Sequence, residues 1–538
     1  MSITSLLPSR PTDPGSQDST RITLWDRLDQ PDSAALHGLF SGAVWFLVAV
    51  IFGITMSEEL TTPDIFSGIA ALVFSRLRPS HVNIVMFGFL ATSMYGAWYF
   101  IVPRLCRTPL RSNRMANVLL FMWNISVIIG TVAIMAGDSK GKEYAEWPWY
   151  VNWLVESLLV LNIIIVYRTI AARRDPKLFV SLWYIGGTVA WITMMYFVGN
   201  VMWHPFTTYL TADGHLHVVW DNLARTVSLP DQNIIAYQST GSVVGLDDAV
   251  GNWFYGHNVL GLFITTGFIP VVYYLVPKIT RRPLYSHIMS LIGFWSIALL
   301  YTNTGQHHLL QAPIPNWLKI VAIVGSVGLF IPVFTFNSNL YMTMRGQWEQ
   351  ALTNIPLRFL LTGSFFYLVV SFQGSVQSLM SVNRFVHFTQ WVIAHAHLAL
   401  LGAFGFIASG AMLYMVPHIV RKPLWSRNLA DTQYWLMLLG INGFFWALTA
   451  AGLAQSSAWI TLGEQVVKAY PVVKPYFYLR SVFGGMIVVG VVMQLINLVM
   501  TVLQTVPDEA AKRREGIRGL EEVSAPATAF DDRALLVD

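Results

Sequence analysis

Twelve apolar runs constrain the fold more than any other feature of this sequence. Each is long enough to cross the roughly 30 Å hydrocarbon core of a bilayer as a helix. A chain in lipid must satisfy its backbone hydrogen bonds internally, so such runs fold as helices. The sequence therefore predicts an all-α membrane protein built as a bundle of twelve transmembrane helices. The runs lie at about 38–56, 80–104, 116–136, 150–168, 179–203, 253–276, 286–302, 316–341, 357–373, 388–416, 434–453 and 481–504.

The composition excludes several classes of protein. Only 12% of the 538 residues are charged and the mean hydropathy is +0.52, whereas soluble domains carry about 25% charged residues. The net charge of +5 comes from basic loops and gives no indication of nucleic-acid binding. A single cysteine, Cys106, excludes a disulfide framework, a multi-cysteine metal site, a C-x-x-C-H haem attachment site and the paired cysteines of a dinuclear copper centre.

Arg and Lys are unevenly distributed among the loops and thereby predict the orientation. They cluster after the even-numbered runs, and acids are found in the alternate loops, so both termini are expected in the cytoplasm. The chain divides into a cytoplasmic segment 1–37 without a signal peptide, a helical domain 38–505 and a disordered cytoplasmic tail 506–538. The long loop 204–252 is expected outside. The basic residues are Arg104, Arg107, Arg111, Arg114, Arg168, Arg173, Arg174, Lys177, Lys278, Arg281, Arg282, Arg421, Lys422 and Arg427.

Six of the 13 histidines fall at one depth, in the outer part of the membrane. A single imidazole there is more often a hydrogen-bonded structural group, but polar side chains in lipid are costly and six at one level are a strong coincidence. Neutral imidazole binds copper, iron and haem. This arrangement predicts metal centres. The six are His81, His257, His307, His308, His395 and His397.

The spacing of these histidines divides them between different metals. His395 and His397 are two positions apart, so on a helix their rings point about 200° apart and cannot easily share one ion. His307, His308 and His257 can form a three-imidazole copper site with an open position. One histidine of the 395/397 pair can then bind an iron beside that copper, and the other can pair with His81 across a second haem.

Five stretches carry a resemblance to a known family: RLRPSHVNIVMFGF, GKEYAEWPW, NWFYGHNVLGLFITTGF, LLYTNTGQHHL and SVNRFVHFTQWVIAHAHLALLGA. They are similar to the haem–copper oxygen reductases, and within that family to the catalytic subunit of cbb3-type cytochrome c oxidase. The resemblance covers about residues 38–505. It implies a terminal respiratory oxidase of the bacterial inner membrane that reduces O2 to water and translocates protons.

The resemblance also implies roles for individual residues. A low-spin b-type haem is expected on His81 and His397, a high-spin b-type haem on His395, and copper on the other three histidines. Tyr301 stands at the family's active-site tyrosine, with a cross-link expected to His257. Complete cleavage of O2 needs four electrons, and a phenol can supply one of them. Because the chain lacks a haem-c motif, membrane-anchored c-type cytochrome subunits are expected as partners, with cytochrome c as donor.

A proton path is expected from the cytoplasm to Tyr301. The spans hold almost no carboxylates, so protons must move along hydroxyls, amides and water; each such group could instead be a helix–helix hydrogen bond. Gln373 takes the place where the family usually has a glutamate, and an amide cannot relay a proton by titration. The expected path residues are Tyr273, Ser290, Asn339, Tyr367 and Gln373.

Three further residues have weaker indications. Arg78 and His387 are candidate partners of haem propionates, although a structural role is the more common one for a histidine placed like His387. Glu143 in GKEYAE resembles a calcium ligand of the family, but a single carboxylate is also typical of a solvated loop.

Two alternatives give different expectations. A nitric oxide reductase, a relative with non-haem iron in the copper position, usually carries a glutamate one turn below the histidine of the sixth span, where this chain has Gly261, and lacks the active-site tyrosine. A metal-free solute transporter would explain twelve spans but not six histidines at one depth.

Overall fold

The computed structural model describes residues 24–202, 206–220, 234–238, 243 and 245–505. Within them twelve helices are long and apolar enough to cross a membrane, which confirms the all-α bundle. Single helices form spans one, three, four, nine and eleven: α2 (Ser33–Thr61), α5 (Asn113–Ala136), α6 (Trp149–Ala171), α15 (Ile355–Gln377) and α19 (Arg427–Ser456, extended by η8, Ser457–Thr461).

The other spans are made of consecutive segments. They are α3, η3 and α4 (Phe74–Asn83, Ile84–Leu90, Ala91–Cys106); α7 and η4 (Val180–Tyr196, Phe197–Val201); α9, η5 and α10 (Gly245–Val259, Leu260–Thr265, Thr266–Thr280); α11 and η6 (His287–Tyr301, Gly305–Leu309); α12 and α13 (Asn316–Gly328, Phe330–Thr343); α17, η7 and α18 (Gln390–His397, Leu398–Gly405, Phe406–Val420); and η9 and α20 (Val466–Ala469, Tyr470–Leu503).

Several spans are longer than hydropathy predicted, mainly at their polar ends. The first begins at Ser33 rather than 38, the sixth at Gly245 rather than 253, and the twelfth at Val466 rather than 481. Helical hydrogen bonding continues past the apolar stretch, and hydropathy does not detect those turns. Segments 1–23 and 506–538, including the tail expected to be disordered, lie outside the described residues.

Three spans form the centre of the bundle, and they carry four of the six histidines. In the windows of spans two, six and ten, 94%, 94% and 78% of residues are buried, against 28–56% for the others. Each of the three contains a π-helical segment just after its histidine: η3 after His81, η5 after His257 and η7 after His397. A π-helical segment shifts the register of the side chains beyond it and is frequent at functional sites.

The three central spans also end in the same way. The sequences VPRLCRTPLRS, VPKITRRPLYS and VPHIVRKPLWS place an arginine in the left-handed conformation at each helix end, and a serine that caps the next helix. Each serine Oγ accepts a hydrogen bond from the backbone N–H three residues on, which satisfies a free donor of the helix. The chain thus contains three equivalent helix junctions at one end of the bundle. The residues are Arg107, Arg281 and Arg421, and Ser112, Ser286 and Ser426.

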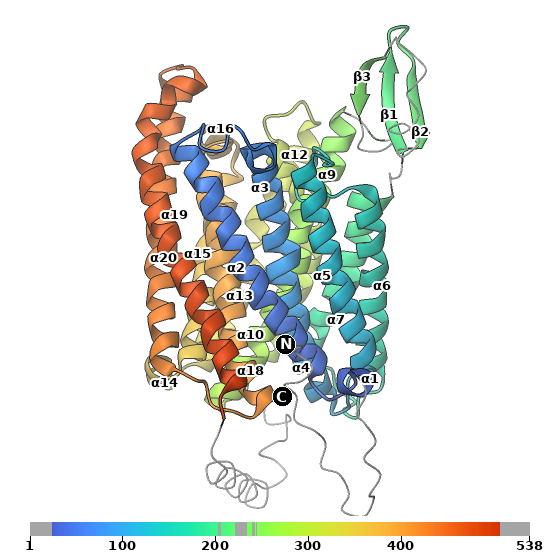
Figure 1. Cartoon of the computed structure of the whole chain (residues 1–538), viewed down its shortest axis with the longest axis vertical. Helices are drawn as coiled ribbons and strands as arrows, with labels where there is room; N and C mark the ends of the chain where they lie inside the picture. Colours follow the sequence, from blue (N-terminus) through green and yellow to red (C-terminus); the bar gives the residue numbers. More distant parts are fainter. Residues whose placement is uncertain (1–23, 203–205, 221–233, 239–242, 244, 506–538) are drawn as a thin grey trace, which may run out of the picture.

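The remaining elements lie outside the spans. Short helices are α1 (Leu24–Leu28), η2 (Ala70–Leu72), α14 (Glu349–Thr353) and α16 (Met380–Val386). The 204–252 loop holds an antiparallel sheet of order β2-β1-β3, made of β1 (Phe206–Thr211), β2 (Leu216–Trp220) and β3 (Ile234–Gln238). The sequence predicted only a long loop here. Gly214, in the left-handed region, closes the β1–β2 hairpin. The sheet stands at the end of the bundle opposite α1 and the last turn of α20 (Figure 1).

Candidate functional site

Three imidazoles from two elements come together at the first part of the candidate site. His257 on α9 and the neighbours His307 and His308 on η6 offer nitrogen atoms that all lie within 4.8 Å of one another. Nδ1 of His257 is 3.3 Å from Nε2 of His308. Among the described residues, these are the three side chains of metal-binding type whose ligand atoms lie close enough together to hold one metal ion. Below, these residues are called the histidine trio.

Neighbouring side chains fix how the trio points. The Oγ of Ser326 donates its proton to the carbonyl of Ala322 at 2.7 Å, so it accepts one from Nδ1 of His307, also at 2.7 Å. That hydrogen bond leaves Nε2 of His307 as a free lone pair. His308 stacks on Trp253 with ring centres 3.8 Å apart. Nε2 of His257 is buried without a hydrogen bond. The trio therefore fits a copper ion, since imidazole nitrogens remain unused inside a buried site.

Tyr301 packs directly against this trio. Its ring centre lies 4.7 Å from that of His257, with the planes 21° apart. The ring also fills the space beside Gly261, where any Cβ atom would overlap it. The tyrosine ring therefore occupies the space that a side chain at position 261 would need, which is where a nitric oxide reductase is expected to carry its glutamate.

His81 and His397 face each other from α3 and α17. Their ring centres are 6.2 Å apart and their planes differ by 16°. Nδ1 of His81 bonds the carbonyl of Ala49 at 2.9 Å and Nδ1 of His397 that of Ile393 at 2.8 Å, so each Nε2 is left as an acceptor. Two metal–nitrogen bonds of about 2 Å each would place such rings about 6 Å apart. The pair fits a six-coordinate haem iron.

An apolar cavity surrounds this pair and contains one charge that sequence analysis missed. Apolar side chains form most of its wall, and Gly53 lies against the ring of His81, where a Cβ would crowd it. Arg480 also lines the cavity although it is only 3% exposed, and its Nε has no hydrogen-bond partner among the described residues. A buried guanidinium suits a haem propionate. Arg480 lies just before the predicted twelfth span, and a longer span would have revealed it.

His395 lies on the other side of α17. Its Nδ1 is 3.1 Å from Oε1 of Gln373, and its ring lies near His257 and His307. The structure thus separates the two histidines of α17, one toward His81 and the other toward the trio. It also gives Gln373 a contact that the sequence did not indicate, because this amide lies within hydrogen-bond distance of His395. Its place in the proton path stays a prediction.

The candidate propionate and calcium residues are mostly paired with each other. Arg78 forms an ion pair with Glu143, which gives that carboxylate a cation from the chain itself. His387 lies near His307 and His308, and its buried Nδ1 has no hydrogen-bond partner among the described residues. Glu146 accepts a hydrogen bond from Asn83 at 2.9 Å, and burial raises its pKa to about 7. The calcium site stays a prediction.

The expected proton-path residues lie on neighbouring helices. Tyr367 lies near Tyr273 and Tyr301, and the ring of Phe336 packs against both Tyr273 and Tyr367. Tyr273 adjoins Ser290 and Asn339, yet its buried hydroxyl forms no direct hydrogen bond within the described chain. A continuous path therefore needs water between these groups.

Asn339 has a structural task as well. Its amide accepts from the backbone N of Ser286 and donates to the carbonyl of Ser286 and to Oγ of Ser290, at 2.8–2.9 Å. Asn497 makes the same two backbone bonds to Ser426 at the equivalent junction between α18 and α19. Part of the role of Asn339 is therefore to fix a helix junction.

Comparison with known proteins identifies the family. The sequence profile of the family described as "Cytochrome C and Quinol oxidase polypeptide I" matches residues 33–487. The chain belongs to this family.

Curated relatives match most of this oxidase chain. A cytochrome c oxidase subunit 1 of Rhodobacter capsulatus is 30% identical over 86% of the chain and 83% of its own length. A cytochrome c oxidase subunit 1 homolog of Agrobacterium tumefaciens is 29% identical over 90% and 86%. A cbb3-type cytochrome c oxidase subunit of Stutzerimonas stutzeri is 28% identical over 87% and 94%. The expected haem–copper oxidase subunit I of the cbb3 type is thereby confirmed.

The fold is also that of a solved oxidase. A haem–copper terminal oxidase dimer determined by cryo-EM matches with a TM-score of 0.66 over 88% of this chain and 84% of that chain, at 15% identity. The family and the twelve spans show that this oxidase subunit is a multi-pass protein of the bacterial inner membrane. Family membership further implies a multi-subunit complex that binds haem and copper.

Proposed function

We propose that this chain is the catalytic subunit of a terminal oxidase that reduces O2 to water with electrons from c-type cytochromes. The observation that supports it most directly is the position of Tyr301, whose ring packs on His257 of a buried histidine trio. A phenol adjoining three clustered imidazoles is suited to O2 reduction and has no place in a transporter.

Each cofactor has a separate set of residues in this proposal. His81 and His397 hold a low-spin b-type haem, His395 a high-spin b-type haem, and the trio holds copper. When bound, the haem iron and copper supply electrons and open coordination positions for O2. Arg480 neutralises propionate charge in the apolar cavity of the first haem. Arg78 and Glu143 are already paired, so calcium would have to share Glu143 with that arginine.

The chain's own groups handle protons. The Tyr301 hydroxyl donates a proton next to the trio. Tyr367, Tyr273 and intervening water then pass a replacement proton to Tyr301 from the end of the bundle that holds the three helix junctions. The distribution of Arg and Lys makes that end cytoplasmic, so protons are drawn from the inside and translocation is coupled to turnover. Electrons enter from membrane-anchored c-type cytochrome subunits on the opposite side.

One experiment separates this function from both alternatives. The purified complex is examined for two haem b signals in a reduced-minus-oxidised spectrum, for copper by metal analysis, and for O2 uptake alongside nitric oxide consumption. The oxidase predicts two haems, one copper and faster use of O2. His81→Leu should remove one haem signal and leave copper in place. Non-haem iron in place of copper, with faster nitric oxide use, would contradict the proposal; an absence of haem would favour a transporter.

The shared junction geometry provides a matched test of the proton path. Asn339→Ala and Asn497→Ala remove the same backbone bonds at equivalent junctions, but only Asn339 adjoins Tyr273. We expect Asn339→Ala to slow O2 uptake at least about tenfold because it interrupts proton delivery, and Asn497→Ala to keep most of the rate. Equal rates in the two variants would assign Asn339 a structural role alone.

Gln373 is expected to act through His395. In Gln373→Leu the Nδ1–H of His395 loses its acceptor, so affinity for the high-spin haem should fall about 10- to 100-fold. Gln373→Glu keeps an acceptor and should retain the haem. The measurement is haem content per chain and the high-spin absorption band. Full haem content in Gln373→Leu would show that packing alone positions His395.

A further inference from the structure

A groove on the lipid-facing side of the bundle is separate from the haem and copper sites. It lies between α15 and α19, with α13 and the segment around α14 at one end. It extends along α15 from Arg358 to Leu368, which corresponds to about 15 Å of helix, half the hydrocarbon thickness of a bilayer. Its lining residues are Tyr341, Trp348, Ala351, Arg358, Leu361, Thr362, Phe365, Phe366, Leu368, Tyr434, Leu438 and Asn442.

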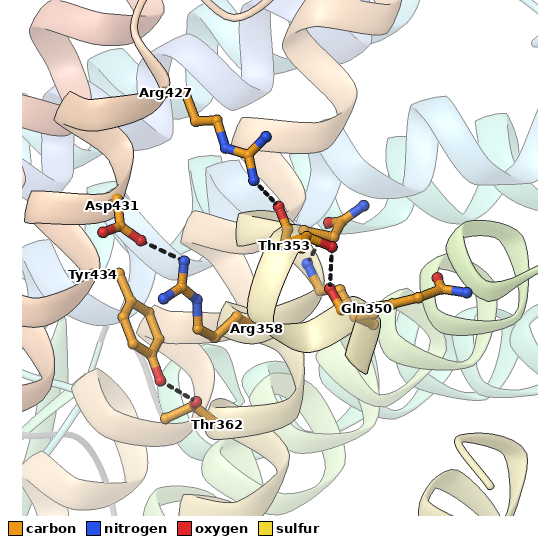
Figure 2. Close-up of polar contacts among 9 residues, drawn as sticks. Gln350, Thr353, Arg358, Thr362, Arg427, Asp431 and Tyr434 are labelled. Carbon is orange, nitrogen blue, oxygen red and sulfur yellow. Dashed lines mark hydrogen bonds and ion pairs between the residues drawn. The ribbon is translucent and has the colours of Figure 1, made fainter. Parts of the chain in front are cut away.

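The charged groups of this groove gather at the end where α15 and α19 begin. Arg358, one turn into α15, reaches across to Asp431 of α19, and its guanidinium lies 4.6 Å above the ring of Tyr434 (Figure 2). The hydroxyls of Thr362 and Tyr434 share a hydrogen bond of 2.8 Å just beyond. Farther along, the wall is apolar except for Asn442, whose amide donates to the carbonyl of Leu438, and Phe365 is 53% exposed toward the membrane. The groove therefore has a charged head and an apolar length, as a phospholipid does.

The donors of Arg358 are only partly used. A guanidinium has five N–H donors. Asp431 accepts from one terminal nitrogen, while Nε is buried and has no acceptor among the described residues. A second guanidinium, that of Arg427, is held on the carbonyl of Thr353 at the same end (Figure 2). An unpaired buried donor is costly, and phosphate oxygens match an arginine fork well.

We propose that this groove binds one anionic phospholipid, with its phosphate at Arg358 and an acyl chain along α15. The distribution of basic loops puts this end at the cytoplasmic face, and basic pockets between helices at that face are suited to anionic lipid headgroups. The bound lipid joins α15 to α19 at the base of the span whose Gln373 orients His395.

Two variants that break the same ion pair should have opposite effects. In Arg358→Gln the phosphate loses its cation, so phosphatidylglycerol binding should weaken at least about tenfold. In Asp431→Asn the phosphate no longer competes with a carboxylate for Arg358, so phosphatidylglycerol binding should be kept or strengthened. Leu438→Trp fills the apolar length without changing any charge and should also weaken binding; a free phosphate ion would be indifferent to it.

The test uses the intact complex in detergent micelles that contain phosphatidylglycerol, with native mass spectrometry counting bound lipid. The haem absorption spectrum reports whether each variant is folded. Preferential retention of phosphatidylglycerol in the unmodified complex and Asp431→Asn, and its loss in the other two, is the expected result. Equal retention in all four, a matching loss in both ion-pair variants, or equal binding of phosphatidylcholine would overturn the proposal.

Discussion

Tyr301→Phe should lower O2 turnover at least about a hundredfold, the range expected when a positioned proton donor is lost. The ring that packs on His257 at 4.7 Å is retained, so the trio keeps its neighbour and only the hydroxyl is missing. Both haem spectra and the copper content should therefore be unchanged. The measurement is O2 uptake by the complex together with metal analysis of the same sample.

A second tyrosine provides the control. The hydroxyl of Tyr167 donates to the carbonyl of Gly186 at 2.8 Å, on the outside of the bundle and away from the histidines. Tyr167→Phe should leave turnover within about twofold, as surface changes away from special features usually do. Normal turnover in Tyr301→Phe would remove the main reason for preferring an oxidase.

Gly261→Ala should have an effect of similar size by a different cause. A Cβ at this position would overlap the ring of Tyr301, so the ring must move away from His257. Displacement by about 1 Å can cost about a hundredfold in rate, while the packing strain itself is about 1–3 kcal/mol. We expect the complex to assemble with haem and copper but to reduce O2 slowly.

The matched glycine is Gly485 in α20, where an added Cβ would meet nothing within 4 Å. Gly485→Ala should leave O2 uptake unchanged. If Gly261→Ala also kept its rate, the ring of Tyr301 could not need its present place beside His257. The same overlap explains in steric terms why a glutamate at 261 and a tyrosine at 301 exclude each other.

The chain pattern predicted the bundle because lipid allows few structures. Apolar runs of sufficient length must become helices, so span number followed from hydropathy, and only the ends differed. The sheet in the 204–252 loop was not expected, because its strands are short and β2 and β3 are separated by a long intervening segment. The twelfth span expected from hydropathy begins at 481, one residue after Arg480. The burial of Arg480 depends on the cavity that α2, α3, α17 and α20 line together.

The candidate histidines and Tyr301 were found from sequence because an imidazole or phenol is conspicuous in an apolar span. Their individual contacts were not. The bonds of Gln373 to His395, of Asn339 to Ser286, and the overlap between Gly261 and Tyr301 join residues 22 to 53 positions apart. The sequence by itself therefore determined the twelve spans and the chemically costly residues within them, since cost in lipid is a property of each residue. Only the tertiary structure decided which of those residues touch, because helix packing and the π-helical turns set the direction of every side chain.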